Sequence, residues 1–147
     1  MATISGGEKL EARLRELAQK VSNPGTLRVG FLEGSTYPDG TPVAMVAAIQ
    51  DYGAPSRNIP PRPFFRNMVA EKKGEWPKAI EDLLIANDYD AKKALEITGE
   101  AIAGQLKDSI LNGSYVPLKP ATVKRKGFDK VLVDTGHMVN SVAYEVK

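Results

Sequence analysis

The chain has 147 residues, the commonest size for one domain, with 42% hydrophobic and 26% charged residues. This balance is typical of a globular protein and argues against a disordered or membrane-spanning chain. Twenty Lys and Arg against eighteen Asp and Glu leave a net charge of +2, which gives no indication of nucleic-acid binding. The absence of cysteine excludes disulfides and thiolate metal sites. Without a signal-peptide pattern or an apolar stretch of roughly 20 residues, we expect a protein made and used in a cytoplasm.

An amphipathic helix is predicted over residues 7–21. Its apolar side chains recur at spacings of four, three and four residues and so share one helical face: Leu10, Leu14, Leu17 and Val21. A turn at 22–25 ends this helix. Apolar residues alternate with other residues over 27–31, which predicts a half-buried strand.

Three further helices are predicted in the middle of the chain. Val43–Tyr52 is expected to be a short, mostly buried helix. A second helix covers about 65–84, where Gly74 and Pro77 are expected to kink or divide it. A third runs from about 90 to 112, with its apolar side chains again at helical spacing.

The last 34 residues lack the long helical patterns of the middle of the chain. Residues 121–126 are expected to make a short helical turn that ends at Gly127, and alternation over 142–146 predicts a closing strand. No repeats or long polar linkers occur. We therefore predict one domain over residues 1–147, with 1–6 flexible.

Asp134-Thr135-Gly136 resembles the motif of retroviral-type aspartic proteases. That chemistry needs two carboxylates sharing a proton, which a homodimer could supply, and also a flap and further strands after the motif. Only eleven residues follow Gly136. We therefore reject a protease and interpret these residues as a structural turn in which Gly136 has a positive φ.

No other catalytic, cofactor or metal site is predicted. His137 is the only histidine, and neither a nucleophile motif nor a metal-ligand spacing accompanies it. The glycines form neither a dinucleotide-binding fingerprint nor a phosphate-binding loop. We expect a protein that is not an enzyme and needs no cofactor.

Basic residues are densest in the segment 119–130: Lys119, Lys124, Arg125, Lys126 and Lys130. Such a patch could contact DNA phosphates. The alternative, which we favour, is a solvated loop or the charged rim of a protein interface, because Phe128 is the only aromatic residue available for stacking on bases.

A proline-rich arm at 58–65 is a candidate docking element. Three prolines stiffen it, so that less conformational entropy is lost when it binds. One of its two phenylalanines is expected to enter the core, while Ile59 and Arg62 contact a neighbour. Our candidate interface residues are Ile59, Arg62, Phe64, Lys124, Arg125 and Lys126.

Three passages together resemble the neck and tail-completion proteins of long-tailed bacteriophages. They are the helix of residues 43–53 ending in Asp51-Tyr52-Gly53, the Ile-Pro-Pro-Arg-Pro-Phe arm of residues 59–64, and residues 117–142, which include the Asp-Thr-Gly turn. Gln50-Asp51 replaces the more usual Asn-Glu, and Val131 stands where a proline is common. The arm precedes the Asp-Thr-Gly segment, which distinguishes this family from a related tail-completion family.

The resemblance implies an α+β fold, in which a small, twisted, mainly antiparallel sheet is flanked by several helices in a single domain. It also implies a structural virion protein that forms a homo-oligomeric ring at the head–tail junction or tail top. The ring would be hexameric because the tail is sixfold. Head-closure and tail proteins are then its partners, and the virion is its location. The second hypothesis is a DNA-contacting module that uses residues 119–130.

Overall fold

The computed structural model describes residues 5–128, 131–132 and 136–147. Its elements follow in chain order: α1 (Gly7–Ser22), β1 (Leu27–Phe31), α2 (Val43–Tyr52), the short 3-10 helix η1 (Pro55–Arg57), α3 (Phe64–Lys72), α4 (Trp76–Ala86), α5 (Ala91–Asn112), α6 (Pro120–Lys126), α7 (His137–Asn140) and β2 (Val142–Val146). The predicted α+β fold is confirmed. The expectation of a flexible start concerns residues 1–4, which lie outside the described residues, and 5–6, which are exposed.

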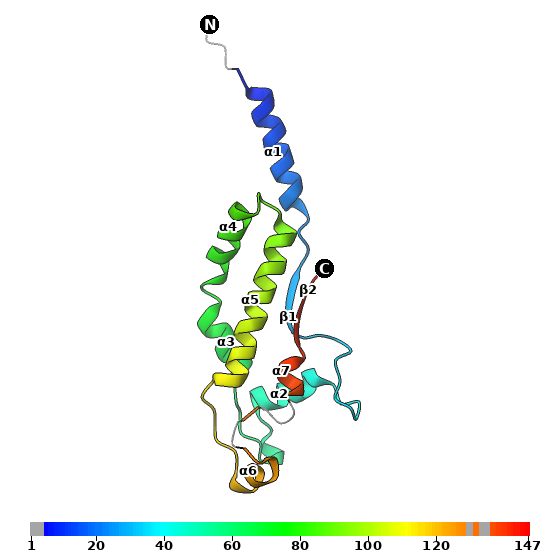
Figure 1. Cartoon of the computed structure of the whole chain (residues 1–147), viewed down its shortest axis with the longest axis vertical. Coiled ribbons are helices and arrows are strands. Elements are labelled where there is room, and N and C mark those ends of the chain that lie inside the picture. The colour runs from blue at the N-terminus through cyan, green and yellow to red at the C-terminus, as the bar shows by residue number, and fades with distance from the viewer. Residues whose placement is uncertain (1–4, 129–130, 133–135) are drawn as a thin grey trace.

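The sheet consists of the two strands that alternation predicted. β1 and β2 pair antiparallel, with Leu27 opposite Val146 and Phe31 opposite Val142. The two strands lie near opposite ends of the sequence, so their pairing brings the two ends of the domain's chain together. One face of the sheet packs against α5 (Figure 1).

The long helix α5 organises the domain, with β1 and β2 on one side and α3 and α4 on the other (Figure 1). Its side chains at helical spacing supply much of the core, including Ile102, Leu106 and Ile110. The predicted division near Gly74 is confirmed, because α3 ends at Lys72 and α4 begins at Trp76. Within the described residues, no helix combines the length and apolarity needed to cross a membrane.

The two ends of the molecule differ. Helix α1 extends beyond the body at one end of the long axis, while α6 lies at the opposite end (Figure 1). None of the residues of α1 is fully buried. The core lies between these ends, where α2, α3, α5, α7 and the sheet meet.

Candidate interaction surfaces

Arg62 and Phe64, both expected at an interface, are instead buried within this chain. Phe64 is 0% exposed and contacts Phe31 edge to face, with ring centroids 6.3 Å apart. It is therefore the phenylalanine that enters the core. Arg62 is 7% exposed, because its guanidinium donates hydrogen bonds to α2 and to the segment before α6. Of the three arm residues expected at an interface, Ile59 alone keeps a partly exposed position.

Asp51 explains how the arm leads into α3. Pro63 precedes this helix and provides no side-chain cap. The carboxylate of Asp51 takes that role from α2, since its Oδ1 accepts hydrogen bonds from the backbone N–H groups of Phe65 (2.9 Å) and Arg66 (3.3 Å). Unpaired N–H groups at a helix start favour such an anion. The sequence analysis did not predict this capping role of Asp51. The signal was available, because a helix that begins without a capping residue of its own needs an acceptor from elsewhere in the chain.

An open groove lies between the arm, the loop before α2, α2 itself and α6. Its volume is about 1070 Å³. Apolar residues form much of the lining: Val46, Ile59, Pro60, Val116, Pro117, Leu118, Leu132 and Met138. Cationic residues also line it: Arg57, Arg62, Lys119, Arg125 and Lys126. Tertiary structure thus brings the arm and the basic segment to one site.

The helical turn predicted over residues 121–126 is confirmed as α6. Three of its cations, Lys124, Arg125 and Lys126, occupy the last turn of α6, where they face the negative end of the helix dipole. Gly127 ends the helix with φ of 81°. Lys124 and Arg125 are exposed, whereas the Lys126 ammonium lies 4.7 Å from the centre of the Phe128 ring. Lys130 lies outside the described residues.

Of the predicted Asp134-Thr135-Gly136 turn, only Gly136 falls within the described residues. Its φ of 80° is the positive value expected of it, and it directly precedes α7. His137 follows, and its Nε2 lies 2.7 Å from the carbonyl oxygen of Thr36. No group of three or more His, Asp or Glu side chains in the described part of the chain could hold a metal ion.

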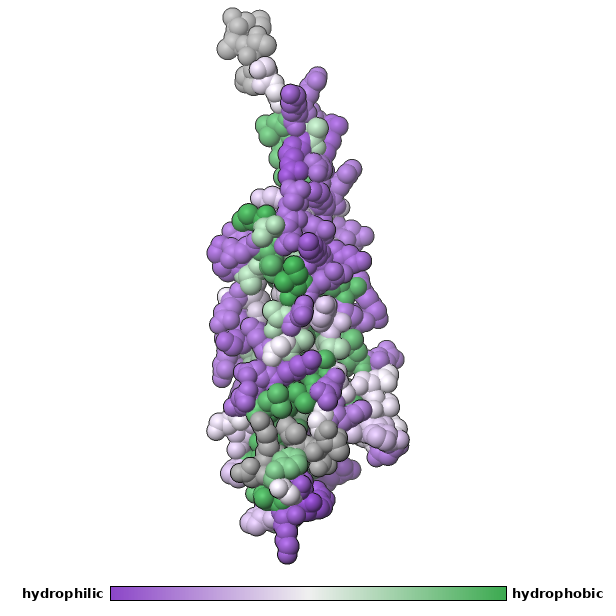
Figure 2. All heavy atoms as spheres, viewed as in Figure 1, coloured by the Kyte–Doolittle hydropathy of each residue, from purple (hydrophilic) through white to green (hydrophobic). Residues whose placement is uncertain are grey.

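The apolar stripe of α1 is a second candidate surface. Leu10, Leu14 and Val21 are 61%, 57% and 42% exposed, and Leu17 is half-buried. The predicted shared face therefore exists, but the body of this chain does not cover it. Figure 2 shows hydrophobic side chains among hydrophilic ones at the α1 end of the molecule. We call Leu10, Leu14, Leu17 and Val21 the α1 stripe.

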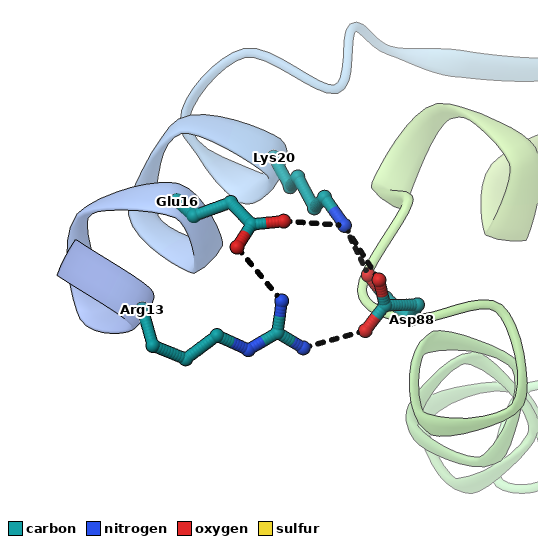
Figure 3. Close-up of polar contacts among 4 residues, drawn as sticks. All are labelled: Arg13, Glu16, Lys20 and Asp88. Atoms are coloured by element: carbon teal, nitrogen blue, oxygen red, sulfur yellow. Dashed lines mark hydrogen bonds and ion pairs between the residues drawn. The ribbon is translucent and has the colours of Figure 1, made fainter. Parts of the chain in front are cut away.

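A cluster of charges connects α1 to the body. Arg13 and Lys20 both contact Asp88, at 2.6 and 2.7 Å, and both also pair with Glu16 (Figure 3). These two cations hold the pKa of the Asp88 carboxyl down at about 2. Asp88 sits in the tight α4–α5 corner, where its own φ is 53° and that of Tyr89 is 61°.

The cluster and the α1 stripe point in different directions. At about 100° per residue, the midpoint of the stripe lies roughly a quarter turn around the helix from Arg13 and Lys20. The ion pairs therefore hold α1 by its polar flank. This leaves the α1 stripe accessible to another molecule.

Comparisons with known proteins found no match. No family model matches the sequence, and neither a curated protein nor a solved structure is significantly similar to the chain.

Proposed function

We propose that this chain is a structural virion protein that forms a homo-oligomeric ring at the head–tail junction or tail top of a long-tailed bacteriophage. In this role it completes the tail and joins it to the DNA-filled head, and it makes and breaks no covalent bond. The sequence resemblance suggests the assembly. The observation that carries the proposal is the exposed α1 stripe.

The α1 stripe has the form of a helix-pairing seam. Spacings of four, three and four residues place Leu10 and Leu17 at one core position of a heptad, and Leu14 and Val21 at the other. Contiguous exposed apolar side chains of this kind are typical of protein interfaces. A narrow seam of two heptads is matched best by an identical seam, so a second copy of the chain is the expected partner.

The flanking charges favour parallel pairing. Arg13 and Lys20 occupy equivalent positions beside the α1 stripe. In an antiparallel pair these cations would face those of the other helix, whereas in a parallel pair Arg13 lies opposite the neutral Ala18. Parallel helices around a common axis keep all the bodies on one side, as a closed ring requires.

The test compares three proteins by light scattering after size exclusion and by negative-stain microscopy. We expect wild type to form rings and Leu14→Glu to be monomeric with an unchanged circular dichroism spectrum, because Leu14 lies outside the core. Ala12→Glu is the matched control, since Ala12 lies on the opposite side of α1. A monomeric wild type, or rings that persist in Leu14→Glu, would contradict the proposal.

The phage role has a separate test. A phage genome that carries Leu14→Glu is expected to yield filled heads and separate tails, seen by electron microscopy. Ala12→Glu is expected to yield normal particles. Normal infectious particles from both variants would rule out this role.

A DNA-contacting role is the second candidate, favoured by one observation. Lys124 and Arg125 are exposed on adjacent positions of α6, and neither forms an ion pair with a described residue. If this role holds, duplex binding weakens steeply with salt and is lost when Lys124, Arg125 and Lys126 are changed to Glu. Salt-independent or undetectable duplex binding excludes it.

A further inference from the structure

The guanidinium of Arg62 lies at the floor of the groove with only neutral hydrogen-bond acceptors. Its Nε donates to the carbonyl oxygen of Val116 (2.9 Å), and its Nη1 donates to Oε1 of Gln50 (3.2 Å). These two bonds connect the arm to α2 and to the segment before α6. They fix the plane of the guanidinium.

The positive charge of Arg62 is not balanced within the described part of the chain. None of the carboxylates there forms an ion pair with it, and Asp51, which directly follows Gln50 in α2, is instead paired with Arg66. An arginine side chain remains protonated in proteins, so it cannot avoid the cost of burial by losing its proton. A buried charge is ordinarily paired.

One nitrogen of this guanidinium remains available to a ligand. Nε and Nη1 are used, and Nη2 donates no hydrogen bond. Within the described residues, no buried side-chain nitrogen or oxygen lacks a partner. Nη2 must therefore be accessible to solvent, and Arg62 lines the groove. The guanidinium thus presents an N–H donor to the groove from a rigid position.

The surroundings of Arg62 indicate which anion fits. Ile59, Val116 and Leu118 line the same groove, while Arg57 and Arg125 add positive charge. The phosphates of duplex DNA are strongly hydrated and evenly spaced, and they match an exposed basic surface better than a single arginine among apolar side chains. A carboxylate within an apolar peptide matches both features.

We propose that this groove binds a peptide segment of a partner protein in which one Asp or Glu is flanked by apolar residues. The carboxylate accepts a hydrogen bond from Nη2 of Arg62, and the flanking side chains contact Ile59, Val116 and Leu118. Helix α6, which lines the groove, and α1, which carries the α1 stripe, lie at opposite ends of the molecule (Figure 1), so this site is independent of ring formation. An assembly protein that carries both could contact its own copies with one end and a different protein with the other.

The experiment uses the full chain and two synthetic peptides, acetyl-Ala-Leu-Glu-Leu-Ala-amide and the same peptide with Gln in place of Glu. Binding is followed by NMR through the Arg62 Nε–H signal and the backbone signals of Ile59 and Leu118. We expect the Glu peptide to bind saturably in the millimolar range. The Gln peptide is expected to bind about tenfold more weakly, since it lacks the charge-assisted bond.

Variants separate recognition from folding. Arg62→Gln is expected to abolish the preference for Glu over Gln. If Arg62→Gln unfolds, the exposed pair Arg57→Glu and Arg125→Glu serves instead and is expected to weaken binding of the Glu peptide severalfold. Lys92→Glu with Lys93→Glu is the matched control at the far end of α5, and it should leave binding unchanged.

Several outcomes would overturn the proposal. These are equal binding of the two peptides, no change in either set of signals, or a change produced by a DNA duplex but not by the Glu peptide. A shift of the same signals when the protein alone is concentrated would assign the groove to a second copy, and that also contradicts it. Loss of rings in Leu14→Glu does not affect this test.

Discussion

The carboxylate of Asp51 and the guanidinium of Arg66 form an ion pair of 2.6 Å at the start of α3. Nη2 of Arg66 also donates to the backbone carbonyl oxygen of Asp51 (2.8 Å). Asp51 is only 3% exposed, so this pair and the two backbone bonds of Oδ1 are what stabilise a carboxylate beside the core. The pair thereby joins the end of α2 to the start of α3.

Replacing Asp51 should be costly. Asp51→Ala leaves two N–H groups of α3 and the Arg66 guanidinium without their acceptor, and we expect a loss of about 2–4 kcal/mol in the free energy of unfolding. Urea denaturation measures it. Asp82→Ala removes an exposed, solvent-screened ion pair with Lys78 and should have a much smaller effect on stability. Equal effects of the two substitutions would show that Asp51 does not anchor α3.

The attachment of α1 to the body should be lost at strongly acidic pH. The pKa of Asp88 is about 2 when folded, below its ordinary value of 3.8, because Arg13 and Lys20 favour its charged form. The stabilisation is therefore present above about pH 4 and is lost as the pH falls through about 2. Nuclear magnetic resonance of the Asp88 carboxyl carbon should give the low midpoint, and relaxation of α1 amides should show the helix released in the same range.

Asp88→Asn provides the control for this pH effect. The variant should show a released α1 already at neutral pH and no further change on acidification. Its unfolding should otherwise match wild type, since Asp88 is exposed and distant from the core. High salt should weaken the attachment in wild type, because the pairs are exposed. A midpoint near 3.8 would contradict the role given to Arg13 and Lys20.

Two glycines of α5 should respond in opposite directions to the same substitution. A Cβ on Gly99 would lie 2.6 Å from Cδ2 of Tyr144 and 2.7 Å from Cδ1 of Leu27, where the helix meets the sheet. Gly99→Ala should therefore destabilise the protein by about 1–3 kcal/mol. Gly104 has no such neighbour within 4 Å, so Gly104→Ala should stabilise it by about 0.5–1 kcal/mol. Thermal unfolding of both variants decides this.

Phe64 should behave as a core residue and not as a contact residue. Phe64→Ala is expected to cost about 3–5 kcal/mol, because it leaves a cavity beside Phe31. Phe128→Ala, at a position 38% exposed, should change stability by less than about 0.5 kcal/mol. If Phe64→Ala has wild-type stability, the packing described for the arm is wrong. Loss of assembly in Phe64→Ala alone therefore gives no information on binding.

Local patterns predicted the elements well because their causes are local. The bounds of α2 and both strands agree with the predictions, since helical spacing and alternation are properties of neighbouring residues. The positive φ of Gly136 was predictable for the same reason. The site was not. Arg62 in a proline-rich arm looks exposed, and its burial depends on Val116, which is 54 residues away in the sequence.

Residue patterns alone were enough to predict an α+β chain with an apolar stripe along its first helix and a stiff arm before its third. The packing of distant segments was needed to show which of these surfaces are covered. It buries Arg62 and Phe64, because the arm folds against α2 and α5, and it leaves the α1 stripe exposed, because Asp88 holds that helix by its polar flank. A surface is covered when residues far apart in the chain come into contact. The spacing of hydrophobic residues within one segment carries no information about such contacts.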